Sequence, residues 1–508
     1  MPKPVFKAYQ QKQAWLIPPS LDDLIDVNHP VRVVSEVIDS IDIDMLIQKY
    51  KGGGASSYHP RMLLKVLVYS YLSNVYSSRK MEAAVKENIH FMWLSGMTKP
   101  DHHTLNRFRS ERLRNILREV FSQIVLLLVD TGHVNLKEVY TDGTKIQSAA
   151  NRYTFVWGRA INTSKARIKE QLRELWKYTQ KLAQEEKGDD TPADFDKINP
   201  KDVKATIENI NATLKHSDDV DPKIKAKLSY AKKHWPSKLR QYAQQQKMLK
   251  GRNSYSKTDP GATFMRMKED HMRNGQLKPG YNAQISTNGQ FVVNYTLHQN
   301  PTDTKTLIPH LKMHEKLYGH LPQVQVTDAG YGSQENYQYL HSKGVEAYIK
   351  PSDFDRKQRK NYQPKNPFAT ENLTYDESKD VYLCPASKPM KPTSCIKKKE
   401  GGILKTFTYY QASGCKGCPL RSGCHDQKGN RIIKVNHKGH LLKHQASERL
   451  KTEKGIYYRK RRPTDVEPVF GNIKYNKGFT RFMLKGIEKT EIEWGLLCIA
   501  HNISKIAV

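Results

Sequence analysis

The stretch YNAQISTNGQFVVNYTLH, residues 281–298, decides the fold that the sequence predicts. It consists of two runs rich in β-branched and aromatic residues, separated by the dipeptide Asn288-Gly289. An Asn-Gly pair between two such runs is the strongest short signal for a β-hairpin, because both residues adopt positive φ angles at little cost. The sequence therefore predicts two adjacent antiparallel strands, at residues 281–287 and 290–298.

Three further strand-like runs surround this hairpin. They lie at residues 138–143, 324–330 and 345–350, and each is bounded by Gly, Asn or Pro. Two segments of helical length and pattern, DTKTLIPHLKMHEKLYG and SQENYQYLHSKG, separate the third strand from the fourth and the fourth from the fifth. An antiparallel meander is thus extended by parallel strands through helical crossovers. This is the order of an α/β fold with an RNase H-like mixed sheet.

The composition of the chain favours a nucleic-acid partner. Its 508 residues include 84 Lys and Arg against 51 Asp and Glu, a formal net charge of +33. Such a charge favours a polyanion, although a merely soluble basic surface is an alternative. The longest apolar run, IVLLLV at residues 124–129, is too short to span a membrane, and the N-terminus MPKPVFKAYQ lacks the apolar region of a signal peptide. We therefore expect a cytoplasmic protein that does not bind membranes.

Residues 1–130 are predicted to form a helical DNA-binding domain. Apolar residues recur at three- and four-residue steps after Pro60, which can begin a helix. In the segment KPDHHTLNRFRSERLR that follows, Asp101 can cap a helix, and four side chains suit contacts to DNA: Thr104, Asn106, Arg107 and Arg109. This arrangement resembles a helix-turn-helix, whose second helix enters the major groove. The alternative is a helical bundle with a solvated basic face.

Two long segments interrupt the predicted core, whose own pieces are residues 131–154, 255–350 and 449–508. Residues 155–254 are highly charged and carry apolar residues at helical spacing, which predicts a helical hairpin or an antiparallel coiled-coil arm. Residues 351–448 are rich in Lys, Pro and Cys and lack helical periodicity. We expect this second segment to be a small Cys-rich insertion, either β-rich or irregular.

Two carboxylates occupy equivalent places in the predicted strands. Asp142 in EVYTDG and Asp328 in VTDAGYG each follow a strand-like run and precede a small residue. Taken singly, each suits a turn or a cap, but the first and fourth strands are neighbours in the proposed core. Two adjacent carboxylates repel each other unless a metal ion or a proton intervenes. We therefore expect a site for two Mg²⁺ or Mn²⁺ ions, one activating the attacking hydroxyl and the other stabilising the leaving oxygen of a phosphodiester.

A third acid is expected from a helix near the C-terminus. The stretch IYYRKRRPTDVEPVFGNIKYNKGFTRF contains Glu467, and Lys474 follows seven residues later, two turns along the same helix face. The acid can then bind metal while the Lys reaches DNA. Pro468 predicts that the helix begins close to it, with Glu467 in the first turn. Asp465 is the rival ligand, but it points elsewhere on that turn.

The motifs of the chain resemble those of bacterial insertion-sequence transposases of the DDE class. Besides the motifs quoted above, the resemblance rests on YTDGTKIQSAANRYTFVWG, TDPGATFMRMKEDHM, GYNAQI and VEPVFGNIK, so that it extends over nearly the whole length. It implies that Asp142, Asp328 and Glu467 are the three metal-binding catalytic acids of a DNA transposase. It further implies binding to the terminal inverted repeats of double-stranded DNA, cleavage and strand transfer by a homodimer or larger assembly, and a location with the bacterial nucleoid.

Around the third acid, the chain departs from the pattern of its relatives. Many of them carry Tyr, Arg, Glu and Lys separated by two, three and six intervening residues. Glu467 and Lys474 keep the last gap, whereas three residues separate Tyr458 from Arg462 and four separate Arg462 from Glu467. Lys474 is thus a candidate for contact with DNA. Although their gaps differ, Tyr458 and Arg462 lie just upstream of the acid and suit contacts to a DNA end, the Arg through a bidentate grip on phosphate.

Cysteine spacing in the second insertion predicts a structural zinc site. Cys415 and Cys418 form a C-x2-C pair, Cys424 follows closely, and Cys384 lies about thirty residues upstream. Four thiolates in such a pattern bind Zn²⁺ tetrahedrally. Cys395 is an alternative fourth ligand, and a set of reduced, partly buried thiols is the alternative to a metal site.

Two other functions are compatible with these residues. An RNase H-like nuclease would hydrolyse DNA without strand transfer, and a non-catalytic repressor descended from a transposase would bind DNA without using metal. The three acids argue against the repressor, because clustered carboxylates that face DNA are unfavourable without a catalytic purpose.

Overall fold

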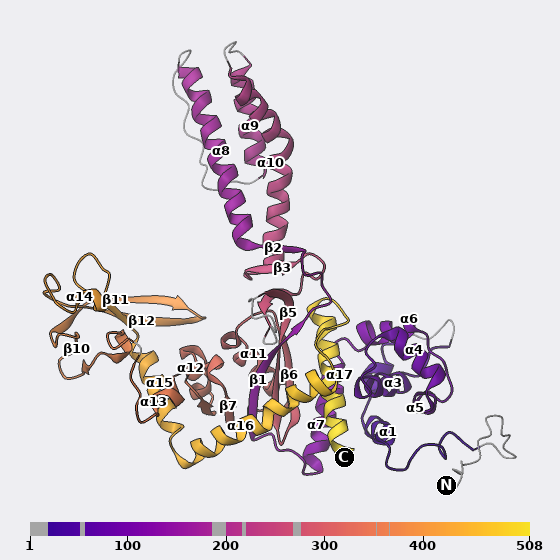
Figure 1. Cartoon of the computed structure of the whole chain (residues 1–508). Helices are drawn as coiled ribbons and strands as arrows, with labels where there is room; N and C mark the ends of the chain where they lie inside the picture. Colours follow the sequence, from indigo (N-terminus) through magenta and orange to yellow (C-terminus); the bar gives the residue numbers. More distant parts are fainter. Residues whose placement is uncertain are drawn as a thin grey trace, which may run out of the picture.

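The computed structural model describes residues 19–50, 56–184, 200–215, 220–267, 276–351, 353–364 and 366–507. A six-stranded mixed sheet lies at its centre (Figure 1). The strands follow in the order β4, β5, β1, β7 and β8, and β6 also pairs with β5. Their bounds are β1 Glu138–Gln147, β4 Thr263–Arg266, β5 Leu277–Asn288, β6 Phe291–His298, β7 Val324–Thr327 and β8 Glu346–Ile349.

The sheet combines an antiparallel and a parallel part. β1, β5 and β6 form an antiparallel meander, whereas β7 and β8 continue the sheet parallel to β1. The crossover helices are α11 (Leu307–Tyr318) and α12 (Gln334–Ser342). The strand predicted at 138–143 extends to Gln147, and the one predicted at 324–330 ends at Thr327, where a 3₁₀ turn begins. A mixed α/β fold is therefore present, with its strands and helices in the expected chain order.

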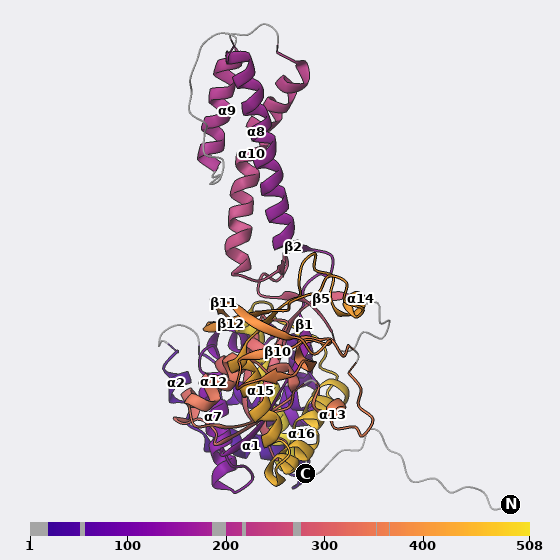
Figure 2. The same cartoon turned by 90° about the vertical axis from the view of Figure 1, so that its left-hand side faces the viewer.

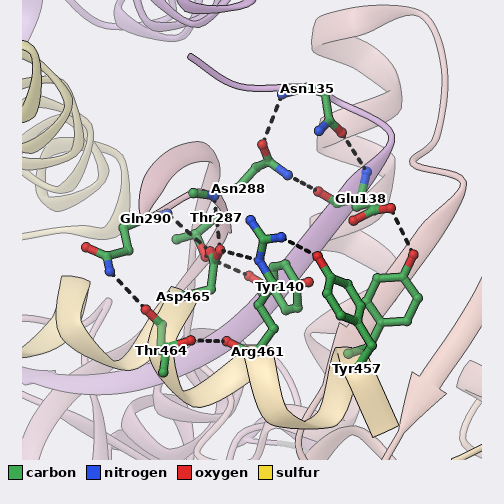
Figure 3. A network of polar contacts seen from close by, with 12 residues as sticks. Asn135, Glu138, Tyr140, Thr287, Asn288, Gln290, Tyr457, Arg461, Thr464 and Asp465 are labelled. Atoms are coloured by element: carbon green, nitrogen blue, oxygen red, sulfur yellow. Dashed lines mark hydrogen bonds and ion pairs between the residues drawn. The ribbon is translucent and has the colours of Figure 1, made fainter. Parts of the chain in front are cut away.

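The hairpin between β5 and β6 turns one residue later than Asn288-Gly289 predicts. Asn288 pairs with Phe291, so the two-residue loop consists of Gly289 and Gln290, whose φ angles are 60° and 66°. Two successive positive φ angles are the signature of a type I′ turn. The carboxylate of Asp465 accepts hydrogen bonds from the backbone N–H groups of both loop residues, at 3.0 and 3.3 Å (Figure 3). These bonds help to hold a non-glycine residue in the left-handed conformation.

Helices from both ends of the chain cover the sheet (Figure 1). α16 (Glu453–Gly471) packs across β1, β5, β7 and β8, while α17 (Ile487–Ile506), α7 (Leu117–Asp130) and α11 pack on β6. Trp494 of α17 is fully buried and donates a hydrogen bond from Nε1 to the carbonyl oxygen of Gln284, at 3.3 Å. Among the residues that the structure describes, no helix is both long and apolar enough to cross a membrane.

The N-terminal helices share one apolar core with the sheet. α3 begins at Pro60, as predicted, and Asp101 caps α6 by accepting a hydrogen bond from the Thr104 N–H at 2.7 Å. α3 packs directly against α17, so this helical region is fixed to the sheet and does not form a core of its own. The bounds are α1 Pro30–Ser40, α2 Asp44–Ile47, α3 Pro60–Leu72, α4 Ser78–Glu87, α5 Ile89–Leu94, α6 His102–Arg107 and a π-helical turn at Phe108–Arg112.

A long helical arm projects from the sheet, as both views show (Figures 1 and 2). It contains an additional helix beyond the predicted hairpin, so that its helices are α8 Gly158–Gln184, α9 Pro200–Leu214 and α10 Pro222–Leu249. Apolar side chains at helical spacing, among them Leu172, Ile207 and Leu228, form a core that belongs to the arm alone. A ribbon of β2 (Phe155–Trp157) and β3 (Ser254–Ser256) joins the arm to the sheet.

A second sheet lies in the segment that precedes α16. Its five strands follow in the order β13, β12, β11, β10 and β9. The tip of the β11–β12 hairpin, at Gly401 and Gly402, lies beside the Glu335 carboxylate of α12. The bounds are β9 Tyr375–Asp376, β10 Val381–Leu383, β11 Pro389–Glu400, β12 Ile403–Gln411 and β13 Ile432–Val435, with helices α13 Phe354–Lys357, α14 Arg421–Cys424 and α15 His437–Arg449.

α11 contains a buried histidine whose ring nitrogens are unsatisfied. His314 is 1% exposed, and neither nitrogen has a hydrogen-bond partner among the described residues. Burial, with a smaller effect of His320, lowers the pKa of His314 from 6.5 to about 4. The unfolded chain therefore binds a proton below pH 6.5 that the folded chain takes up only near pH 4. His314 therefore lowers the free energy of unfolding as the pH falls from 6.5 to about 4, by about 2 kcal/mol at pH 5.

We expect His314→Leu to remove this acid sensitivity. Because Leu has a similar volume and leaves no polar atom unsatisfied, the free energy of unfolding at pH 7.5 should change by less than about 1.5 kcal/mol. The loss between pH 7.5 and pH 5 should be smaller than in the wild type by about 2 kcal/mol, as measured by urea unfolding at both values. His444→Leu, at a side chain that is 71% exposed, is the control and should keep the wild-type pH dependence. An unchanged pH dependence in His314→Leu would contradict the assignment.

Candidate active site

The parallel register of β1 and β7 brings Asp142 and Asp328 side by side. Thr141 pairs with Thr327, and each acid is the next residue of its chain. Asp328 follows the end of β7, whereas Asp142 lies inside β1, which continues along β5 as far as Gln147. The prediction that Asp142 ends a strand is therefore wrong in detail. Asp142 stands where the parallel pairing with β7 stops, while the antiparallel pairing with β5 continues.

Both acids are oriented by backbone groups next to them. Asp142 is 5% exposed, and its Oδ1 accepts a hydrogen bond from the Gly143 N–H at 2.7 Å. Asp328 is half-buried and caps the 3₁₀ turn Ala329–Tyr331, where its Oδ1 accepts from the Gly330 N–H at 2.8 Å. These short contacts fix the direction in which each carboxylate points.

Asp303, which the sequence analysis did not identify, lies at the same place. Its Oδ1 accepts hydrogen bonds from Asn282 Nδ2 at 2.7 Å and from Gln284 Nε2 at 2.9 Å. A Cβ atom added to Gly330 would lie 3.1 Å from an Asp328 oxygen and 3.4 Å from an Asp303 oxygen, so these two carboxylates flank the same point. The sequence signal was the alternation of Asn282 and Gln284 on one face of a strand whose other face carries Tyr281, Ala283 and Ile285.

The glycine after Asp142 is needed for this approach. A Cβ on Gly143 would lie 2.0 Å from Gln284 Nε2 and 2.9 Å from Asp303 Oδ1, both of which are too close. Tyr331 reports the charge of the cluster: burial raises its pKa well above the usual value, and the carboxylates of Asp303, Asp142 and Asp328 raise it further. The negative charges of three acids from separate parts of the chain therefore act on one buried phenol.

Glu467 reaches the cluster through Arg462. The guanidinium donates to Glu467 Oε1 at 3.0 Å and lies 3.3 Å from Asp142 Oδ2, so it bridges the two acids. The Arg462 side chain is 15% exposed and that of Glu467 is 56% exposed. A positive charge thus occupies the space between two of the predicted metal ligands, which lowers their mutual repulsion.

The prediction that Glu467 lies in the first turn of its helix is wrong. α16 begins at Glu453 and contains both Pro463 and Pro468. A Pro within a helix leaves the carbonyl four residues earlier without its usual donor. The Thr464 carbonyl, which Pro468 cannot serve, accepts instead from Gln290 Nε2 at 3.0 Å (Figure 3). The turn of the β5–β6 hairpin therefore supplies the missing hydrogen bond.

Asp465 has a structural role in the same region. Besides its contacts to the hairpin loop, it accepts a hydrogen bond from Thr287 Oγ1 at 2.6 Å, and it is 3% exposed (Figure 3). Its carboxylate therefore ties α16 to the end of β5.

Two other residues were predicted around the third acid: Tyr458 contacts the start of β1, and Lys474 lies beyond the end of α16. Tyr458 is 7% exposed and donates to Glu138 Oε1 at 2.8 Å. Glu138 begins β1, four residues before Asp142, or about 13 Å away along an extended strand. Lys474 is 9% exposed and lies in a π-helical turn, Asn472–Asn476, so the α-helical face that it was predicted to share with Glu467 ends before it.

The residues predicted to contact DNA in the N-terminal region fall into two groups. Thr104 and Arg107 line a surface hollow beside Tyr50 and Arg112, and Asn106 is half-exposed. Arg109, in contrast, is 2% exposed.

The environment of Arg109 is that of a core residue. Its Nη1 donates to Tyr71 Oη at 3.1 Å and to the Tyr76 carbonyl at 2.8 Å, and it lies 3.8 Å from Glu493 Oε1. The structure therefore places Arg109 inside the core, where its charge balances a buried carboxylate, and its predicted contact with DNA does not agree with this position.

One small cavity of about 20 Å³ is lined by the four cysteines of the proposed zinc pattern, Cys384, Cys415, Cys418 and Cys424. His425 and Arg431 line it as well. Backbone N–H groups approach the Sγ atoms of Cys384 and Cys415 at 3.4 Å. Cys395 is exposed on β11 and does not line this cavity. Within the described ranges, neither at these cysteines nor at the acid cluster do three His, Cys, Asp or Glu side chains converge in a geometry that holds a metal ion.

The fold and the site together describe a protein that carries a group of acidic side chains where the parallel pairing of a mixed α/β sheet ends. Two family models match the chain: residues 19–111 match Transposase domain (DUF772), and residues 383–507 match Transposase DDE domain. The resemblance to insertion-sequence transposases of the DDE class is thereby confirmed. The second match contains Glu467, whereas Asp142 and Asp328 lie between the two matched regions. No curated protein and no solved structure matches the chain.

Proposed function

We propose that the chain is a DNA transposase that cleaves DNA and transfers strands with an RNase H-like catalytic core. The observation that carries the proposal is the cluster of Asp142, Asp303 and Asp328 at the sheet edge, to which Arg462 links Glu467. The order β6, β5, β1, β7, β8, with three antiparallel strands followed by two parallel ones, supports the RNase H-like assignment. In this proposal the arm and the Cys-rich segment are insertions into that core.

The acid cluster suits divalent cations such as Mg²⁺ or Mn²⁺. Its donor set consists of carboxylate oxygens, which these hard ions prefer. Asp142, Asp328 and Glu467 would hold them, and Asp303 is placed to orient the Asp328 side of the site. When bound, the ions would activate the attacking hydroxyl and stabilise the leaving oxygen of the phosphodiester. Arg462, which bridges Asp142 and Glu467, would then be free to turn toward a DNA phosphate.

The charge of +33 supports duplex DNA as the partner. Thr104, Asn106 and Arg107 remain candidates for contacts to the terminal repeats, and Lys474 and Tyr458 for contacts to the DNA end. Arg109 is withdrawn from this set because it is buried. We further propose that a homodimer or a larger assembly pairs the two ends.

The proposal is tested with purified protein and a supercoiled plasmid that carries the DNA flanking its gene. Reactions contain Mg²⁺, Mn²⁺ or EDTA, and the positions of breaks and of joined products are sequenced. Metal-dependent breaks at the element ends, followed by joining to new sites, are expected. Breaks without joined products would indicate a nuclease, and binding without breaks under any divalent ion would overturn a catalytic role.

We also propose that Cys384, Cys415, Cys418 and Cys424 hold one structural Zn²⁺. The cysteines line a common cavity, and backbone N–H groups that point at sulfur are suited to stabilise thiolates. We expect about one zinc ion per chain after purification without added metal, measured by elemental analysis. Cys418→Ser should lower both the zinc content and the melting temperature, whereas Cys395→Ser, the matched control, should change neither. Zinc-free protein of unchanged stability would contradict this site.

A further inference from the structure

Helix α10 of the arm has an unusual composition. Its sequence, PKIKAKLSYAKKHWPSKLRQYAQQQKML, has 28 residues, eight of which are Lys or Arg, and none of which is Asp or Glu. Surface helices of soluble proteins normally mix both signs, because neighbouring opposite charges stabilise them. A helix that gives up this stabilisation over its whole length has a surface suited to a polyanion.

Most of these cations lie on one face of the helix. At 100° per residue, six positions fall within an arc of about 100°, and they extend over about 37 Å of helix. All six side chains are exposed; they are Lys225, Lys232, Lys233, Arg240, Lys247 and Lys250, the last of which caps the helix. We call this set the α10 stripe. Its length is close to one turn of B-form DNA, about 34 Å.

Among the residues that the structure describes, no acidic side chain pairs with the α10 stripe. None of its six side chains makes a hydrogen bond or ion pair with another residue of the described chain. The described ion pairs of the arm lie elsewhere, between Lys227 and Glu174 and between Lys204 and Glu208. Long, solvated Lys side chains keep their conformational freedom until a partner binds, and they can follow an irregular row of phosphates.

The arm is not built to associate with another arm. Its apolar face is already used, because Ile168, Leu175, Ile210, Trp235 and Leu239 are buried in the arm's own three-helix core. A coiled coil with a second copy would require an unpartnered apolar stripe. It would also bring two strongly basic helices together, which is unfavourable. A polyanion therefore fits this surface better than a second copy of the chain does.

The base of the arm is close to the acid cluster in the chain. β1, which carries Asp142, is followed by the β2–β3 ribbon from which the arm rises (Figure 1). The neck carries exposed aromatic side chains, Tyr153 at 79% and Phe155 at 44% exposure. DNA that is held at the acid cluster and extends past this end of the sheet would meet the arm.

We propose that the α10 stripe binds the phosphates of duplex DNA beyond the segment held at the acid cluster, without reading its sequence. This inference rests on the proposed function only for the choice of DNA as the polyanion. The arm adds affinity through the release of condensed counterions, because each phosphate that a Lys or Arg neutralises releases cations to solution. Its contribution is therefore large at low salt and weak at high salt.

The test is the salt dependence of DNA binding by the full-length protein. The variant carries Gln at Lys225, Lys232, Lys233 and Arg240, all exposed, so that the fold is preserved and circular dichroism can verify it. Binding to an unrelated duplex of about 40 base pairs is measured by fluorescence anisotropy between about 50 and 200 mM KCl. We expect the slope of log K against log salt to become less steep by about 3. An unchanged slope would overturn the proposal.

Two controls separate this result from the proposed catalytic function. Exchanging the same positions between Lys and Arg keeps their charge and should keep the slope. Asp142→Asn should keep the wild-type slope as well, because it alters the acid cluster and not the α10 stripe. A reduced slope in a protein that never cleaves DNA would support the arm and contradict the transposase. Metal-dependent cleavage, with an unchanged slope in the Gln variant, would support the transposase and contradict the binding of DNA by the arm.

Discussion

Asp142→Asn is expected to lower the rate of metal-dependent DNA cleavage by at least about a thousandfold. Asn keeps the size of the side chain and an oxygen that can accept from the Gly143 N–H, so the local structure should persist. It removes the negative charge that faces Arg462 at 3.3 Å and that we propose to bind a divalent ion. Plasmid cleavage in Mg²⁺ measures the loss.

DNA affinity should be unchanged in the same variant within about twofold, since phosphate contacts by Lys and Arg supply most of it. Anisotropy in EDTA measures this affinity. Asp130→Asn, at an exposed position on α7, is the matched control and should cleave at the wild-type rate. Cleavage by Asp142→Asn at the wild-type rate would contradict a catalytic role for the acid cluster.

Arg109→Met is expected to lower the free energy of unfolding by about 3 to 5 kcal/mol. The substitution leaves the Glu493 carboxylate buried at 0% exposure without the guanidinium that lies 3.8 Å from it. It also leaves Tyr71 Oη without the donor at 3.1 Å. Urea unfolding at pH 7.5 measures the loss. Arg107→Met is the control, because that side chain is 69% exposed and should cost less than about 0.5 kcal/mol.

The destabilisation that Arg109→Met causes should increase with pH. Burial already raises the pKa of Glu493 above 4.5, while Arg109 holds it down, so the variant should raise this pKa further. A carboxyl group with a raised folded-state pKa withdraws stability as the pH rises above 4.5. Arg109→Met should therefore be less destabilised at pH 5 than at pH 8, and adding Glu493→Gln should restore part of the loss at pH 8. Equal destabilisation at both values would contradict a buried charge pair.

The strands and crossovers of the central sheet could be predicted because their signals are local. Alternating apolar residues and a Gly-containing turn determine where β5 and β6 lie, and only the exact loop position escaped, since Asp465 stabilises Gln290 from 175 residues away. The start of α16 was missed for a related reason. A Pro at 468 predicts a helix start unless a distant group replaces the lost hydrogen bond, and Gln290 does so.

The neighbouring positions of candidate site residues were predictable where strand order decides them, and not where side-chain packing does. Asp142 and Asp328 follow from two strands that pair in parallel. Asp303 escaped because its position depends on side-chain amides of β5 that bond to it across the sheet. Arg109 was misassigned because one sequence cannot show that a cation faces inward, toward Glu493 on a helix that lies 384 residues further along the chain.

Because α16 is attached directly to the hairpin loop, the segment that precedes α16 does not have to position Glu467. Asp465 and the Thr464 carbonyl bond directly to Gly289 and Gln290, so the sheet itself sets the position of Glu467 two residues later. The chain between Asp328 and α16 need only be long enough to connect the end of β7 with the start of α16. A change in the length of this segment would therefore leave Glu467 in its place.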